Sequence, residues 1–86
     1  MIERRYFVYL LASRKNGTLY CGVTRDLTAR TWTHREGDIP GFTSRYGVKR
    51  LVWYEAHTDI HEAIKREKRI KKWPRAWKIN LIEAQN

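Results

Sequence analysis

The stretch from residue 5 to residue 12, RYFVYLLA, constrains the fold of this chain more than any other part of the sequence. It is a continuous run of aromatic, aliphatic and β-branched side chains, which is typical of a strand covered on both faces. Lys15-Asn16-Gly17 follows, and Asn-Gly accepts the positive φ angles of a tight turn. Residues 18–24 then predict the return strand of a hairpin.

Local signals predict the middle of the chain as a helix, a loop and a strand. Asp26 suits the N-cap of a helix over 27–36, and Gly37 suits its end. Residues 37–48 contain glycines and a proline and predict a loop, although their aromatic and basic side chains are unusual for a simple connection. A third strand is expected over 49–56.

Two helices are expected in the last third of the sequence. Asp59 and Glu62 form a capping-box pattern that opens a helix ending near Lys72. Pro74 breaks that helix and suits the first turn of another, which should end near Ala84. The element order ββαβαα, a hairpin and one further strand with helices on its faces, predicts a small α+β domain.

Length and cysteine content limit the class of protein. With 86 residues there is room for one domain, which we expect to span 1–86. The single cysteine, Cys21, cannot form an internal disulfide, so a reducing, cytoplasmic setting is expected. No apolar run reaches the length of a membrane span, and the N-terminal apolar stretch is too short for a signal peptide.

The charge of the chain indicates a polyanionic partner. Eighteen Lys and Arg against nine Asp and Glu give a net charge of +9 and a pI near 10.1. Between Lys65 and Lys78 there are eight basic residues and one acidic residue. Nucleic acid is the usual partner of such a surface. The alternative is a basic helix whose charges only keep the protein soluble.

One carboxylate, Glu67, interrupts an apolar helix face. That face is expected to consist of Ile60, Ala63, Ile64 and Ile70. A carboxylate directed toward a core is costly unless it is paired or binds a metal. An ion pair with Arg30 or a hydrogen bond to a tyrosine would satisfy it without any function.

Polar groups on three other elements complete a candidate site. Tyr9 and Tyr20 lie on neighbouring predicted strands, and Arg30 and His34 lie one turn apart on the first predicted helix. If these groups converge with the carboxylate, a divalent cation, a guanidinium and a phenol would together suit phosphodiester hydrolysis.

The last helix repeats the pattern of a polar residue on an apolar face. Asn80 is expected there beside Trp77, Leu81 and Ala84, with Trp77 packed in the core. A buried asparagine most often satisfies backbone groups, so this position carries little weight by itself.

In these positions the sequence resembles the GIY-YIG nuclease family, specifically its small stand-alone members related to the nuclease module of the excinuclease C subunit. The two signature elements correspond to Phe7-Val8-Tyr9 and Tyr20-Cys21-Gly22, the family arginine to Arg30 and the family glutamate to Glu67. Segments 41–47 and 66–73 also match the small members, so the resemblance covers essentially the whole chain. It implies a three-stranded antiparallel sheet with three flanking helices and a divalent-metal-dependent nuclease activity.

The resemblance also implies a role for each site residue. Glu67 would be the sole protein ligand of Mg²⁺ or Mn²⁺. Tyr9 and Tyr20 would flank the scissile phosphate, one of them as general base, and Arg30 would stabilise the negative charge of the transition state. His34 would bond a tyrosine or the attacking water, or be structural. The family asparagine would be Asn80 by spacing, or alternatively Asn86.

The expected partner is DNA, with no membrane and no organic cofactor. Lysine and arginine contacts to phosphate supply affinity, and exposed aromatic side chains stack on unpaired bases, which favours single-stranded or branched DNA. The expected contact residues are Arg25, Phe42, Arg45, Tyr46, Lys68, Lys71 and Lys72. A role in DNA repair would follow. A non-catalytic nucleic-acid-binding module and a repair-partner interaction module are the alternatives, but neither needs an inward carboxylate such as Glu67.

Overall fold

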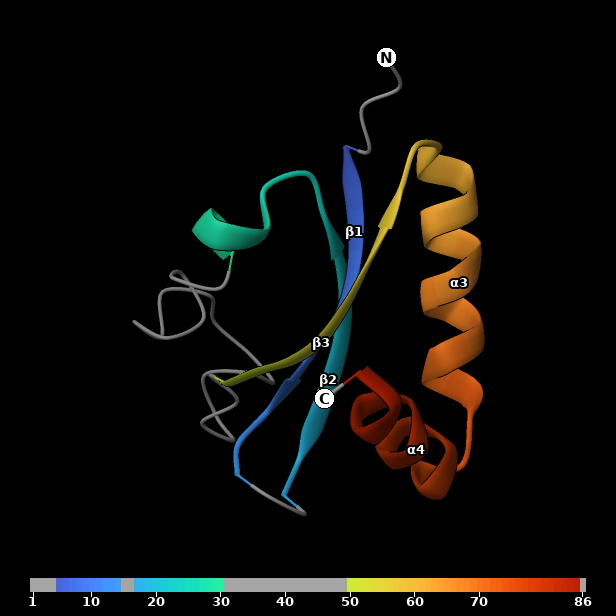
Figure 1. The fold of residues 1–86 in the computed structure, drawn as a ribbon. Coiled ribbons are helices and arrows are strands. Elements are labelled where there is room, and N and C mark those ends of the chain that lie inside the picture. The colour runs from blue at the N-terminus through green and yellow to red at the C-terminus, as the bar shows by residue number, and fades with distance from the viewer. Residues whose placement is uncertain (1–4, 15–16, 31–49, 86) are drawn as a thin grey trace.

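A three-stranded antiparallel sheet forms the centre of the protein. The computed structural model describes residues 5–14, 17–30 and 50–85. The strands are β1 (Tyr6–Ala12), β2 (Leu19–Thr24) and β3 (Arg50–His57), in the order β2-β1-β3 with both pairs antiparallel. The predicted α+β fold, with the order ββαβαα, is confirmed (Figure 1).

The apolar run that opens the chain becomes the central strand. Residues 8–12 of β1 are all buried, because strands lie on both edges of β1 and side chains cover both of its faces. The turn after β1 is closed by the Ser13 N–H, which donates to the Thr18 carbonyl at 3.0 Å. The Gly17 carbonyl accepts from an Arg75 guanidinium, so the last helix holds this hairpin turn from outside.

The helices begin at the predicted caps. The Ala29 N–H donates to Asp26 Oδ1 at 3.0 Å, and the helical segment after β2 starts at Leu27 and is described as far as Arg30. Helix α3 (Ile60–Lys72) begins after Asp59, whose carboxylate accepts from the His61 N–H at 2.8 Å.

Helix α4 (Arg75–Gln85) follows the Trp73-Pro74 break. The side chain of Gln85 pairs with both backbone groups of Tyr54, accepting at 3.3 Å and donating at 2.7 Å, which fastens the end of α4 to the edge of β3. In the part of the chain that the structure describes, no helix is long and apolar enough to cross a membrane.

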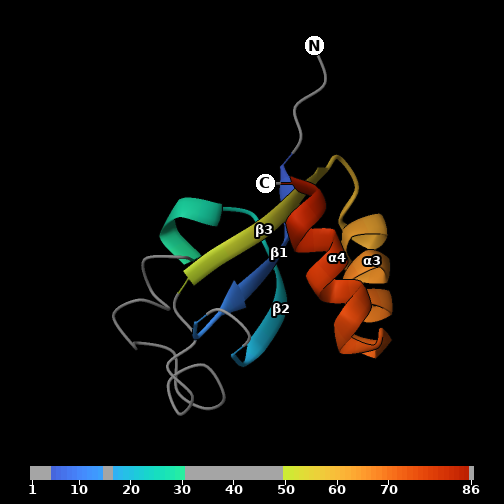
Figure 2. The same ribbon diagram turned by 60° about the horizontal axis from the view of Figure 1, so that its bottom comes forward.

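The two faces of the sheet carry different layers. Helices α3 and α4 lie on one side, whereas the helical segment that starts at Leu27 lies on the other (Figures 1 and 2). The larger core cluster is on the α3 side and contains Val8, Leu10, Cys21, Trp53, Ala63 and Ile70. On the opposite side Tyr9 and Leu11 are buried beneath Tyr20 and Leu27. The sheet therefore separates the tyrosines from the main core.

The prediction of which side chains form the apolar faces of α3 and α4 is partly wrong. Ala63 and Ile70 are buried, but Ile64 is 38% exposed and Trp77, expected in the core, is 55% exposed. Helix α4 packs on the core through Leu81 and Ile82 instead. Trp77 instead makes edge contact with Trp73, with ring centroids 5.8 Å apart.

Candidate active site

Two tyrosines from adjacent strands meet on the sheet face opposite α3. Tyr9, at the middle of β1, is only 2% exposed, and Tyr20 on β2 is half-buried. Their ring centroids are 6.3 Å apart with the planes tilted by 43°. The alternation of side chains along the two strands puts both rings on this face, because Tyr9 pairs with Gly22 and Leu11 pairs with Tyr20.

Gly22 provides the space that the Tyr9 ring occupies. A Cβ atom at this position would lie 2.5 Å from Tyr9 Oη, 2.7 Å from Tyr9 Cζ and 3.1 Å from Tyr20 Cε1. Contacts that short with a buried ring require the ring to move. In the sequence, Gly22 was only one residue of a short motif. The strand register explains why this residue is a glycine, because it places Gly22 opposite Tyr9.

The electrostatic surroundings of Tyr9 keep its phenol protonated. Burial raises the pKa of Tyr9 above its ordinary range, with a further contribution from Tyr20, while the guanidinium of Arg30 acts in the opposite direction. Arg30 lies one helical turn after Asp26 and is exposed, so its charge is not removed from water. Leu27, at the start of the same segment, packs beside the tyrosines and anchors this segment on their face.

Glu67 lies on α3, at the turn that packs beside Cys21 of the edge strand β2. Its side chain is 17% exposed, and its Oε2 lies 3.3 Å from Lys71 Nζ, one turn further along α3. Within the described residues Lys71 is thus its ion-pair partner, where the sequence had suggested Arg30 or a tyrosine. The thiol of Cys21 on β2 donates to the Glu67 carbonyl oxygen at 4.0 Å, which fixes this turn of α3 against β2.

The charges of Glu67 and Arg30 both act on the phenol of Tyr9. The carboxylate of Glu67 raises the pKa of Tyr9, although it does so less than burial does. The charges of Arg30 and Glu67 thus both affect Tyr9, which lies beside Tyr20.

The chemistry of Glu67 fits a hard divalent cation. It is a single carboxylate, only partly open to solvent, that already holds a positively charged group at 3.3 Å. Mg²⁺ is commonly bound through one or two carboxylates and keeps several waters and substrate phosphate oxygens as its other ligands. In a site of this kind Glu67 would hold the ion, and the Lys71 ammonium would have to move away from the carboxylate.

The thiol beside Glu67 is strongly shielded. Burial raises the pKa of Cys21 to about 12, and the nearby carboxylate of Glu67 acts in the same direction. At neutral pH this side chain is therefore a neutral, weakly polar group.

This shift makes stability sensitive to alkaline pH. The folded protein keeps its thiol proton where the unfolded chain, with a pKa of about 8.5, has lost it. We expect the free energy of unfolding to fall as the pH rises from about 9 toward 12, and Cys21→Ala to reduce the slope. Urea denaturation at a series of pH values measures this. An equal slope in both proteins would contradict the assignment.

The remaining predicted site residues divide into two groups. His34, Phe42, Arg45, Tyr46 and Asn86 lie outside the described residues. Asn80 lies on α4 and is exposed, so it does not occupy the buried position expected for it, because α4 turns Leu81 and Ile82 toward the core. The predicted contact residues Arg25, Lys68, Lys71 and Lys72 are all exposed.

Comparison with known proteins shows the family of this chain. The model of the family described as GIY-YIG catalytic domain matches residues 5–80. A UPF0213 protein of Staphylococcus epidermidis is 34% identical over 79 residues, covering 92% of this chain and 95% of the relative. A UPF0213 protein of Staphylococcus aureus is 35% identical over 80 residues, covering 93% and 96%.

A solved structure also resembles this one. The solution NMR structure of a UPF0213 protein from Bacillus halodurans has a TM-score of 0.56 and 32% sequence identity. The similarity covers 92% of this chain and 83% of that one. The sheet and Tyr9, Tyr20, Arg30 and Glu67 lie within residues 5–80, the range that the family model matches.

Proposed function

Because the chain belongs to the GIY-YIG catalytic domain family, we propose that it is a divalent-metal-dependent endonuclease that hydrolyses phosphodiester bonds in DNA. The observation that carries the proposal is the pair of Tyr9 and Tyr20 on adjacent strands, with ring centroids 6.3 Å apart, together with the effect of the Arg30 and Glu67 charges on the pKa of Tyr9. A protein that only binds nucleic acid needs no carboxylate at this place, since a carboxylate repels phosphate. We also propose that the protein works in a reducing, cytoplasmic compartment, as its single thiol leads us to expect.

The residues of the site divide the chemistry between them. Mg²⁺ or Mn²⁺ held by Glu67 would stabilise negative charge on the phosphate. The protonated phenol of Tyr9 is a hydrogen-bond donor for a phosphate oxygen, and Tyr20, the more exposed of the pair, is the better placed to take a proton from water. Arg30 adds positive charge to the transition state. Supporting roles for His34 and Asn80 remain predictions.

The charge distribution supports a nucleic-acid substrate. The exposed side chains of Lys68, Arg69 and Lys72 lie along α3, and Arg75 and the ring of Trp77 are exposed on α4. Lysine and arginine contact phosphates regardless of sequence, and an exposed indole stacks on an unpaired base. We therefore propose single-stranded or branched DNA as the substrate.

A cleavage assay on the purified protein tests the proposal. Labelled single-stranded, duplex and branched DNA are incubated with Mg²⁺, Mn²⁺ or EDTA, and the products are resolved on denaturing gels. We expect internal cuts with either metal, no cuts in EDTA, and faster cleavage of single-stranded and branched DNA than of duplex.

The control for a contaminating nuclease is chromatographic. Activity must follow the protein peak through size-exclusion chromatography, since a contaminant of another mass would separate. Salt-sensitive DNA binding without cleavage under every metal condition would instead support the binding module.

A further inference from the structure

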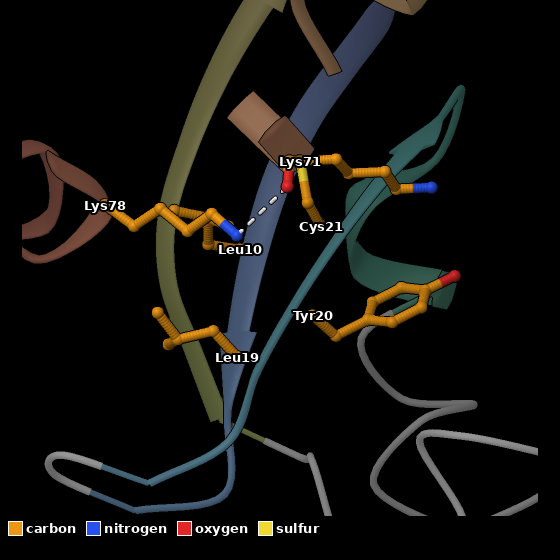
Figure 3. Close-up of a pocket in the computed structure, with 6 residues that line it drawn as sticks. All are labelled: Leu10, Leu19, Tyr20, Cys21, Lys71 and Lys78. Atoms are coloured by element: carbon orange, nitrogen blue, oxygen red, sulfur yellow. Dashed lines mark hydrogen bonds between the residues drawn. The ribbon is translucent and has the colours of Figure 1, made fainter. Parts of the chain in front are cut away.

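A cavity opens beside the candidate active site, between the edge strand β2 and the ends of the two long helices. Its volume is about 260 Å³. It is lined by Leu10, Leu19, Tyr20, Cys21, Lys71 and Lys78 (Figure 3). None of the reaction roles proposed above uses Leu10, Leu19 or Lys78.

The floor of the cavity is apolar and uncharged. Leu10 and Cys21 are opposite each other in the β1–β2 pairing, and Leu19 pairs with Ala12, so all three face the α3 side of the sheet. Leu10 and Cys21 are buried, whereas Leu19 is partly exposed. A flat apolar group can lie on this floor without displacing a charge.

Two ammonium groups stand at the rim. Lys78 Nζ lies 3.5 Å from the Lys71 carbonyl oxygen, a weak contact, and it extends from α4 toward the end of α3 (Figure 3). Lys71 Nζ lies 3.3 Å from Glu67. The Lys71 side chain is 52% exposed, so this second ammonium can turn from the carboxylate to an anion without a metal ion. The two lysines therefore offer positive charge to successive phosphates on the two sides of β2.

The cavity shares two residues with the candidate active site. Tyr20 belongs to the tyrosine pair and also lines the cavity, and Lys71 pairs with Glu67 and also lines it. In Figure 3 the Tyr20 ring and the Lys71 side chain extend to the same side of β2, whereas Lys78 and Leu19 lie on the other side. A chain of phosphates passing round the edge of β2 would connect the two places.

We propose that this cavity is a subsite for one unpaired nucleotide next to the scissile phosphate, with its base against Leu19, over the buried Leu10 and Cys21, and its flanking phosphates on Lys78 and Lys71 at the two sides of β2. This inference rests on the proposed nuclease function and specifies how the substrate is held. The volume suits one base, being below the range of about 300–1,000 Å³ that holds drug-sized ligands. A base inside an intact duplex is stacked and paired and cannot enter, so the subsite selects unpaired strands.

The test compares two ligands of equal charge. One is a tetranucleotide of thymidine, and the other is a tetramer of abasic deoxyribose phosphates without any base. Binding is measured in EDTA by NMR titration of the wild-type protein, so that no cleavage takes place. We expect the thymidine ligand to bind about tenfold more tightly, with amide shift changes at Leu19 and Cys21 that the abasic ligand does not produce.

Matched variants separate the base contact from the phosphate contact. Leu19→Glu should remove the difference between the two ligands, whereas Leu51→Glu, on a different strand, should preserve it. Lys78→Gln should weaken the binding of both ligands by about threefold to tenfold. Lys65→Gln, which loses the same charge on an exposed part of α3, should have a smaller effect. Equal binding of the two ligands, or a difference that survives Leu19→Glu, overturns the proposal.

Failure of the subsite and failure of the nuclease proposal give different results. Metal-dependent cleavage together with equal binding of the two ligands overturns only the subsite. A base-dependent difference that vanishes in Leu19→Glu, in a protein that never cleaves, supports the subsite and overturns the nuclease. Because the shift changes are measured on the wild type, the test stands even if Leu19→Glu does not fold.

Discussion

Glu67→Gln is expected to lower the rate of DNA cleavage by about a thousandfold or more while leaving the fold intact. The amide has nearly the same shape as the carboxylate but cannot hold a divalent cation by charge, and a catalytic metal supplies several kcal/mol of transition-state stabilisation. The ion pair with Lys71 is lost as well. Since Lys71 is 52% exposed, that loss costs at most about 1 kcal/mol of folding free energy.

The matched control is Glu62→Gln on the same helix. The side chain of Glu62 is 61% exposed, and its carboxylate lies 3.6 Å from Lys65, so this variant loses an equal charge and a comparable pair away from the tyrosines. Single-turnover cleavage rates and thermal melts are measured for both variants. A Glu67→Gln protein that cleaves within tenfold of the wild type would show that the metal site lies elsewhere.

Gly22→Ala is expected to lower the free energy of unfolding by about 1–3 kcal/mol and to remove cleavage activity. The new methyl group would meet Tyr9 Oη at 2.5 Å and Tyr9 Cζ at 2.7 Å, and Tyr9 is 2% exposed, so its ring has little room to move. Displacing the ring disturbs the strand pairing and moves the phenol away from Arg30 and Glu67. Thermal denaturation and the cleavage assay measure the two effects separately.

Second-site changes identify the cause of this effect. Tyr9→Phe removes only the hydroxyl and leaves Cζ too close, so the double variant with Gly22→Ala should stay destabilised. Tyr9→Leu opens more space, and its combination with Gly22→Ala should recover stability relative to Tyr9→Leu alone, without recovering activity. If Gly22→Ala melts like the wild type, the sheet accommodates the methyl group and the close packing at Gly22 has no consequence.

The elements of the fold could be predicted well because their signals are local. The apolar run became β1, Asp26 and Asp59 cap the helices that follow them, and α3 ends at Lys72 as expected. Strand register and helix caps depend on hydrogen bonds and side-chain alternation within a few residues. The prediction that Trp77 packs in the core was wrong. The periodicity of a sequence does not show where one helix lies against another, and α4 packs on the core through Leu81 and Ile82.

The candidate site was predicted less completely than the fold. Tyr9 and Tyr20 lie together as expected, and the charges of Arg30 and Glu67 both reach Tyr9. The pairing of Glu67 with Lys71 was missed, although the spacing of four residues on a helix with the acidic residue first is a recognisable signal. The cavity beside Tyr20 had no signal in the sequence, since its six lining residues come from four separate elements.

By itself the sequence determined the hairpin, the helix boundaries and the positive charge. It also identified the polar residues, such as Glu67, that interrupt apolar faces. Each of these follows from composition or from interactions between residues close along the chain. Only the tertiary structure decided that Gly22 makes room for Tyr9, and that the turn of α3 carrying Glu67 lies against Cys21 of β2. The reason is that both depend on contacts between residues far apart in the sequence, which form only when β1, β2 and α3 are packed together.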